Sequence, residues 1–180
     1  MVTSATDKIR EVRELCDQGA WPGVLTFAQA WHTERPSDPK ALFYQGLALS
    51  TMGRFLEAET SYRRALKLDG NDFKTWNNLA GLLFEGMKRH ADGAQCLTQA
   101  LKLDPGNKLA WANLASMNGQ LGRHQQALEC AERALALDPH MVEAQLHRAR
   151  AAQMLGQMDI VQAASEALAK VPPEQFRRIH

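Results

Sequence analysis

The chain has 180 residues, and its 27 alanines and 23 leucines far outnumber its 17 valines, isoleucines and threonines. Because alanine and leucine favour helices and β-branched residues favour strands, this composition predicts an all-α protein. The 21 basic and 20 acidic residues leave a net charge of +1, too little to neutralise several phosphates, so we expect no nucleic-acid partner.

Two features of the sequence bear on membranes and location. The longest apolar stretch, Leu79–Phe84, is far shorter than the roughly 20 residues that span a bilayer, so we expect no membrane insertion. The first residues are polar and charged, whereas a secretory signal peptide needs an apolar stretch there. We therefore expect a cytoplasmic protein.

In chain order, the predicted elements are successive pairs of helices. Each pair has two amphipathic helices of roughly 12 to 15 residues, with one break between them and another after them. Glycine marks the middle break, because it readily takes a positive φ and so ends one helix before the next begins antiparallel. The third pair carries one extra residue within 85–92, where Gly86 is out of phase, so we expect a longer turn there. The regular middle glycines are Gly19, Gly53, Gly122 and Gly156.

The pairs are copies of one unit of about 34 residues. The segments RRALKLDG, TQALKLDP and ERALALDP begin at Arg63, Thr98 and Glu132, at spacings of 35 and 34 residues. WNNLA and WANLA begin at Trp76 and Trp111, which are 35 residues apart. We expect a single domain over 1–180. Its repeats cover 5–38, 39–72, 73–107, 108–141 and 142–175, and residues 176–180 are either the start of a capping helix or a truncated end.

These copies resemble the tetratricopeptide repeat (TPR), a helix–turn–helix unit of 34 residues. The resemblance implies a right-handed superhelical solenoid of about five repeats, with small residues at repeat positions 8, 20 and 27, where helices cross too closely for large side chains. The matching residues are Gly46, Ala80, Ala115 and Ala149, then Ala58, Gly93 and Ala127, then Ala65, Ala100 and Ala134. In the first and last copies, larger residues stand at these positions, which suits end repeats because they have only one neighbour. The larger residues are Val12, Val24, Trp31, Val161 and Leu168.

The sequence offers no grouping of residues suited to catalysis or metal binding. The histidines include no pair three or four residues apart on one helix, and His90 and Cys96 would lie on opposite helix faces. Cys96 and Cys130 occupy equivalent positions in successive repeats, about 8 to 10 Å apart, which is too far for a disulfide. Three unpaired thiols suit a reducing compartment. We therefore expect no enzymatic activity, no cofactor and no metal.

The TPR resemblance further implies that the first helix of each repeat lines a concave groove with repeat positions 2, 5, 6, 9, 12 and 13. We expect this groove to bind a peptide segment of a partner protein, which would make the protein a non-catalytic interaction scaffold. The candidate groove residues are Phe43, Tyr44, Leu47, Lys74, Asn77, Asn78, Gly81, Phe84, Ala112, Asn113, Ser116, Gln120, His147 and Arg150.

Asn78 and Asn113 take the same groove position in adjacent repeats. An asparagine amide donates and accepts hydrogen bonds, so it can hold a peptide backbone whatever its side chains. This resembles the asparagine ladder in the TPR arrays of O-GlcNAc transferases, and the alternative is that both amides bond to neighbouring repeat backbone. No triplet of repeats completes the dicarboxylate clamp of chaperone adaptors, of which Lys74 and Asn78 form a fragment. Phe43 and Phe84 are candidate apolar anchors or, alternatively, core residues.

Two other functions remain open at this point. One is self-assembly into homo-oligomers through the terminal repeats, with Trp21, Trp31 and Phe176 as apolar contacts. The simpler interpretation of the tryptophans is burial within the first repeat. The other function is that of a substrate-recruiting part of a larger enzyme.

Overall fold

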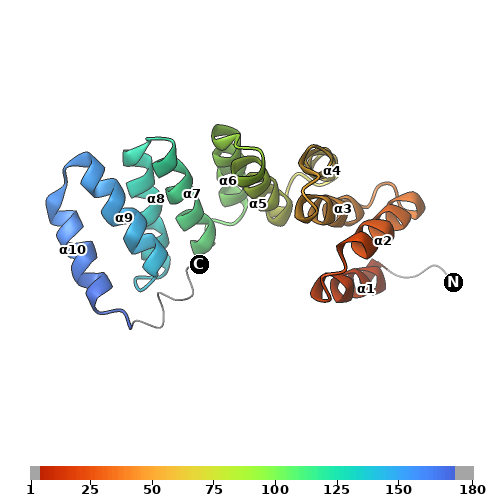
Figure 1. The fold of residues 1–180 in the computed structure, drawn as a ribbon, viewed down its shortest axis with the longest axis horizontal. Coiled ribbons are helices and arrows are strands. Elements are labelled where there is room, and N and C mark those ends of the chain that lie inside the picture. The colour runs from red at the N-terminus through yellow and green to blue at the C-terminus, as the bar shows by residue number, and fades with distance from the viewer. Residues whose placement is uncertain (1–4, 173–180) are drawn as a thin grey trace. The chain divides into compact units, whose positions relative to one another are not determined.

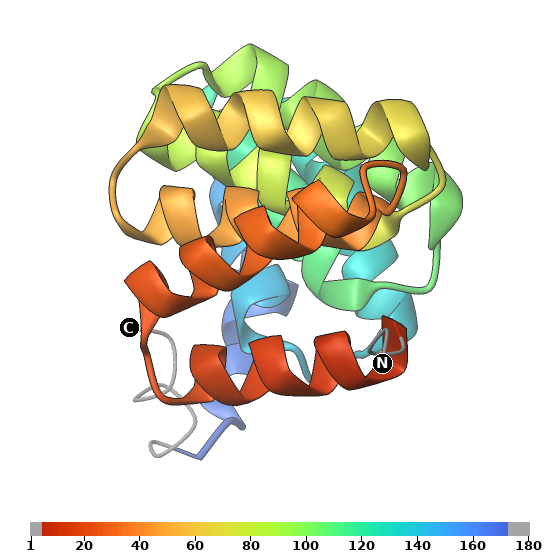
Figure 2. The same ribbon diagram turned by 90° about the vertical axis from the view of Figure 1, so that its right-hand side faces the viewer.

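The computed structural model describes residues 5–172, which form ten α-helices, one π-helix and no strand (Figure 1). The all-α prediction is confirmed. Figures 1 and 2 show the helices following one another as antiparallel hairpins with short turns. The elements are α1 (Ala5–Asp17), α2 (Trp21–Glu34), α3 (Pro39–Thr51), α4 (Phe55–Leu68), α5 (Phe73–Gly81), η1 (Leu82–Gly86), α6 (His90–Leu103), α7 (Lys108–Gln120), α8 (His124–Leu137), α9 (Val142–Leu155) and α10 (Met158–Ala169).

The chain divides into two compact units, with the boundary between Cys96 and Leu97. In the first unit α3 packs against both α2 and α4, and α4 packs against α5 and η1. In the second unit α7 packs against α8 and α9, and α9 also packs against α10. No helix within residues 5–172 combines the length and the apolar character needed to cross a bilayer.

Small residues set how closely the helices of the first unit approach. A Cβ atom added at Gly46 would lie 2.8 Å from the ring of Tyr62, a side chain that is itself only 1% exposed. Since ordinary carbon contacts are 3.5 to 4 Å, this crossing of α3 and α4 needs glycine. The same demand falls on Gly93, where a Cβ atom would lie 2.9 Å from the carbonyl oxygen of Ala80.

The second unit uses alanine for the same purpose. Ala134 is fully buried and forms one core cluster with Ala112, Met141 and Ala144. A second cluster contains Ala127, Leu128 and Ala151. In the first repeat the larger residues Val12, Val24 and Trp31 are fully buried instead, whereas Val161 and Leu168 of the last repeat are half-buried. Phe176 and Ile179 lie outside the described residues.

The recurring tryptophans fasten the first helix of a repeat to the turn before it. The indole N–H of Trp76 donates to the carbonyl oxygen of Gly70 at 2.9 Å, and that of Trp111 donates to the carbonyl oxygen of Pro105 at the same distance. Each bond spans six residues, so the repeated WNNLA and WANLA segments reflect one local structure.

Trp31 differs from these tryptophans because it lies on α2, the second helix of its repeat. Its Nε1 donates to Asp38 Oδ2, in the turn after that helix, at 3.0 Å.

The middle turns follow the predicted pattern except in the third hairpin. Gly19, Gly53, Gly122 and Gly156 have φ values between 67° and 76°. In the third hairpin Lys88 takes the left-handed conformation, with φ of 56°. The extra residue of this repeat is accommodated by η1. This π-helix begins at Leu82, three residues before the segment 85–92 in which we expected the extra residue. A π-helical turn inserts one residue without ending the helix, so the irregularity is a wider helix turn as well as a different loop.

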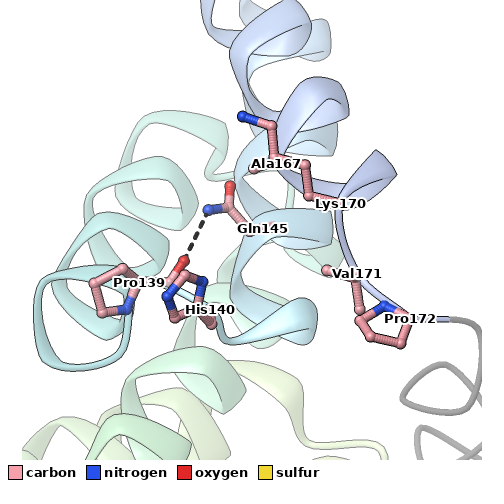
Figure 3. Close-up of a pocket in the computed structure, with 7 residues that line it drawn as sticks. All are labelled: Pro139, His140, Gln145, Ala167, Lys170, Val171 and Pro172. Atoms are coloured by element: carbon pink, nitrogen blue, oxygen red, sulfur yellow. Dashed lines mark hydrogen bonds between the residues drawn. The ribbon is translucent and has the colours of Figure 1, made fainter.

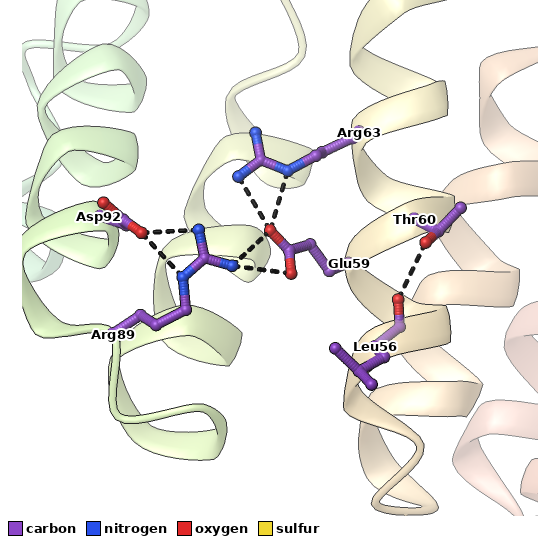
Figure 4. Close-up of polar contacts among 6 residues, drawn as sticks. All are labelled: Leu56, Glu59, Thr60, Arg63, Arg89 and Asp92. Carbon is purple, nitrogen blue, oxygen red and sulfur yellow. Dashed lines mark hydrogen bonds and ion pairs between the residues drawn. The ribbon is translucent and has the colours of Figure 1, made fainter.

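An ion-pair network ties this unusual turn to α4 (Figure 4). Arg89 Nη1 donates to both carboxylate oxygens of Glu59, at 2.8 and 2.9 Å, while its Nε donates to Asp92 at 2.8 Å. Glu59 also accepts from Arg63 Nε at 2.9 Å. The Glu59 side chain is 13% exposed, so this carboxylate has exchanged most of its water for two guanidinium groups.

Candidate functional site

Positions 2, 5, 6, 9, 12 and 13 of the repeats come together in two pockets, one within each unit. The pocket of the first unit, the first groove pocket, has a volume of about 260 Å³. Its walls come from α1 and α3, from Asp72 just before α5 and from the first turn of α5. The residues that line it are Ile9, Arg13, Cys16, Asp17, Lys40, Phe43, Tyr44, Leu47, Asp72 and Lys74.

One side of the first groove pocket is aromatic. The rings of Phe43 and Tyr44 meet edge to face with centroids 5.1 Å apart, and Tyr44 stacks on Trp31 at 6.2 Å. Phe43 also lies 6.2 Å from the ring of Tyr62, so it contacts the core while one face lines the pocket. The pocket thus contains a rigid apolar wall that loses little conformational freedom when a ligand binds.

The other side of the first groove pocket is charged. Lys40 Nζ lies 3.4 Å from Asp72 Oδ2, and Asp72 also accepts a hydrogen bond from the hydroxyl of Thr75. Arg13 and Lys74 are exposed cations at its rim. This pocket therefore combines both signs of charge with an aromatic wall.

The pocket of the second unit, the second groove pocket, has a volume of about 520 Å³. It is lined by α7, by the first turn of α8 and by α9. Four of the predicted groove residues meet here: Ser116, Gln120, His147 and Arg150. The full lining is Ala115, Ser116, Gly119, Gln120, His124, Ala127, His147, Arg150, Ala151 and Met154.

Burial and the neighbouring Arg150 lower the pKa of His147, and the nearby Glu143 opposes this shift. Desolvation is the largest cause, because burial disfavours the charged imidazolium. Gln120 Nε2 lies 3.5 Å from Ser116 Oγ, which links two polar groups of the α7 wall.

Other predicted residues are placed less favourably for ligand contact. Phe84 is 5% exposed and meets His90 edge to face at 4.5 Å, which places it in the core as the alternative interpretation held. Ala112 is 3% exposed and belongs to a core cluster. Asn77 and Gly81 are half-buried on α5 and line neither groove pocket.

The two asparagines lie in different units. Asn78 is half-buried, and its Nδ2 donates to the carbonyl oxygen of Lys74 at 2.8 Å, within its own helix. This bond uses a donor that a peptide ligand would need, although the side-chain oxygen of Asn78 keeps its acceptor capacity. Asn113 is exposed on α7.

Sequence reasoning missed two sets of pocket residues. The α1 residues Ile9, Arg13, Cys16 and Asp17 occupy repeat positions 5, 9, 12 and 13, so the periodicity could have identified them. His124 comes from the second helix of its repeat, for which a rule based on first helices gives no signal.

A third cavity, of about 350 Å³, lies beside the last hairpin (Figure 3). Gln145 occupies the repeat position that Trp76 and Trp111 occupy in earlier repeats, and its Nε2 likewise donates to a carbonyl six residues earlier, that of Pro139, at 3.3 Å. Because an amide is smaller than an indole, it leaves space that the cavity occupies. The remaining lining residues are His140, Ala167, Lys170, Val171 and Pro172.

Within residues 5–172 no group of three histidine, cysteine or acidic residues is arranged to hold a metal ion. The three cysteines are free. Burial raises the pKa of the Cys130 thiol to about 11, despite a hydrogen bond from Asn118 that acts in the opposite direction.

Comparisons with known proteins agree with this architecture. Three solved structures share the fold: a crystal structure of MamA (18% identity, TM-score 0.80, covering 100% of both chains), a MamA fragment from Desulfovibrio magneticus RS-1 (21%, TM-score 0.77, covering 94% of each chain), and pilF of Pseudomonas aeruginosa (22%, TM-score 0.78, covering 92% of this chain and 75% of that one). No curated protein matches the sequence.

Sequence profiles described as tetratricopeptide repeat match residues 39–72, 73–107 and 109–141. Each match begins at or next to the first residue of α3, α5 or α7. Together the profiles cover more than half of the sequence, and the chain belongs to the tetratricopeptide repeat family.

Proposed function

We propose that this protein is a non-catalytic interaction scaffold, a single domain of five repeats that binds a segment of a partner protein along the concave face of its first helices. Membership of the TPR family supports the scaffold role. The main support for binding in the groove is that both groove pockets are lined mainly by the repeat positions expected to face a ligand.

The character of the two pockets suits a protein segment. The first offers Phe43, Tyr44 and Leu47 beside charged groups, and the second offers hydrogen-bond donors beside Met154, which is 61% exposed. Aromatic residues and arginine in pockets are the usual composition of protein-binding hot spots. The asparagine ladder remains part of this proposal through exposed Asn113 and the free acceptor of Asn78.

Quantitative affinity capture from an extract of the source cells tests the groove. Leu47→Glu puts a charge into the first groove pocket, and Ser116→Trp fills the second. Thr60→Glu, at an exposed position of α4 outside both pockets, is the matched control. Thermal melts first establish that each variant is folded.

We expect a set of proteins that the wild type and Thr60→Glu retain and that both groove variants lose. Equal capture by all four folded proteins would place binding elsewhere on the surface. The Asn78→Ala, Asn113→Ala double variant tests the ladder separately, because loss of capture there requires the amides themselves.

The proposal also addresses the cellular compartment and self-association. The three free thiols fit the reducing environment of the cytoplasm. Self-association through Trp31 is disfavoured, because that side chain is fully buried and its N–H is already bonded to Asp38.

A further inference from the structure

The second groove pocket is lined by hydrogen-bond donors and by no carboxylate. Its charged and titratable residues are Arg150, His124 and His147, and the remaining polar lining consists of Ser116 and Gln120. Every one of these five side chains can donate a hydrogen bond. The first groove pocket, by contrast, contains two aspartates among its lining residues.

The charged and titratable side chains among these donors have no partner of their own within residues 5–172. Within the described part of the chain, Arg150 forms no ion pair and the imidazoles of His124 and His147 form no hydrogen bond. Arg54 and Arg89, elsewhere in the molecule, are both held by carboxylates. Arg150 therefore has its planar set of donors available to a ligand.

The first turn of α8 adds to the positive character of the pocket. It contributes His124 and Ala127 to the lining. The N-terminus of a helix carries a partial positive charge that nearby acidic residues offset. Among the second helices of the repeats, α4, α6 and α10 carry Glu57, Asp92 and Asp159 in their first turns, whereas α2 and α8 carry no acidic residue there.

Apolar side chains lie on both sides of Arg150 along α9. Leu146 and Met154 are four residues before and after it, on the same helix face, and are 39% and 61% exposed. A ligand that covers both must continue in two directions from the arginine. This arrangement favours an internal side chain of the partner over a terminal carboxylate.

We infer that the second groove pocket binds the ionised side chain of an aspartate or glutamate within the partner segment, with apolar residues of that segment on either side. This inference rests on the proposed function and gives its partner a chemical class. The guanidinium of Arg150 supplies paired donors to the carboxylate. The imidazole of His124 supplies an additional donor, and that of His147 supplies a donor and, when protonated, additional charge.

The same geometry makes binding depend on pH. The charged groups that face His147 are Arg150 and Glu143 on α9 itself; α8 adds His124 to the pocket, and α7 and α10 add no charged lining residue. His147 is held in its neutral form, and a bound carboxylate favours the protonated form. Binding therefore takes up a proton, so affinity increases as the pH falls, until the carboxylate of the ligand is itself protonated near pH 4.

Selection from a random dodecapeptide library tests the inference on the full chain. The peptides are displayed fused at their C-termini, so they offer side-chain carboxylates and no terminal carboxylate. The baits are wild type, Arg150→Gln, and the control Arg133→Gln, an exposed position of α8 that does not line the pocket. Thermal melts confirm that each bait is folded.

We expect wild type and Arg133→Gln to select peptides enriched in aspartate or glutamate between apolar residues, and Arg150→Gln to lose this enrichment. A selected set without acidic residues, or one equally acidic with Arg150→Gln, overturns the carboxylate inference while leaving peptide binding intact. Failure of the wild type to select any peptide would contradict the proposed function itself.

A titration of the best selected peptide supplies the second readout. Between pH 7.5 and 5.5 the affinity for wild type should increase by up to about tenfold, since a change of one pKa unit on binding is a factor of ten. His147→Gln should bind with a flatter pH profile, because its amide does not titrate. An unchanged profile in that variant would remove His147 from the account.

Discussion

At the scale of single residues, two glycines at adjacent repeat positions have opposite environments. A Cβ atom added at Gly46, at repeat position 8, would lie 2.8 Å from the buried ring of Tyr62. A Cβ atom added at Gly81, at position 9, would meet nothing within 4 Å. Gly46→Ala should therefore destabilise the protein by about 1 to 3 kcal/mol through overpacking. Urea unfolding measures this loss directly.

Gly81→Ala is the matched control for that substitution. It should be neutral or should stabilise the protein by up to about 1 kcal/mol, because alanine restricts the unfolded chain and favours the helix. If both variants lost the same stability, the close approach of α3 and α4 at Gly46 would not be the cause.

The cysteines provide a residue-scale test of burial that depends on pH. With its pKa raised to about 11, Cys130 has only about one thiolate per thousand at pH 8. Cys16 is half-exposed, so it should react first with a thiol reagent in the native protein. Labelling of Cys130 should accelerate about tenfold for each unit of rising pH, as the thiolate is the reactive form.

Mass spectrometry of partially labelled protein at pH 7, 8 and 9 identifies the reacting cysteine. A Cys16→Ser variant should then show almost no labelling before it is unfolded. Labelling of Cys130 at the rate of Cys16 would contradict the burial of that thiol.

At the scale of elements, the sequence predicts the regular hairpins well and the irregular one poorly. The turn glycines and the small residues at helix crossings are required by local geometry, and the repeated tryptophans form one recurring hydrogen bond, so the spacing of these residues is visible in the chain. The extra residue near Gly86 was also visible, but how it is accommodated was not. A π-turn and a loop insertion differ in the hydrogen bonds of a few backbone groups, which no residue type in Leu82–Gly86 specifies.

The turn after η1 leads to a prediction for this element. Lys88 has φ of 56° and is exposed, in a conformation that glycine adopts without steric cost. Lys88→Gly should stabilise the protein by about 0.5 to 1 kcal/mol by removing this cost. Denaturant unfolding measures the change.

Arg133→Gly, at an exposed position inside α8, is the control for the glycine itself. It should destabilise the protein by about 0.5 to 1 kcal/mol, the usual penalty in a helix interior. A loss of stability in both variants would mean that Lys88 makes a compensating contribution in its turn.

Helix crossings in the second unit give a further test at the element scale. Ala134 is fully buried against Ala112, Met141 and Ala144. Ala134→Leu should therefore cost about 1 to 3 kcal/mol. Thermal melts of this variant beside Ala136→Leu, at an exposed position two residues further along α8, separate overpacking from a general effect of leucine. Equal melting temperatures would show that the repeat positions are assigned in the wrong phase.

At the scale of the whole molecule, the repeat phase links the sequence to the candidate site. Position numbers alone predicted one set of groove residues. In the structure Phe43, Tyr44, Leu47 and Lys74 of that set line one pocket, and Ser116, Gln120, His147 and Arg150 line another. The assignment of each residue to a repeat position identifies which backbone positions face a groove. It does not predict how far a side chain turns inward, which is why Phe84 was a candidate anchor and lies in the core.

The most direct test of the concave binding face is site-specific photo-crosslinking in the source cells. A photoreactive amino acid replaces Leu47 or Gln120 in the groove pockets, or Thr60 or Gln125 on exposed faces of α4 and α8. We predict covalent adducts with the same partner protein from both groove positions and none from the two outer positions. Adducts from Thr60 and Gln125, with none from Leu47 and Gln120, would contradict binding in the groove.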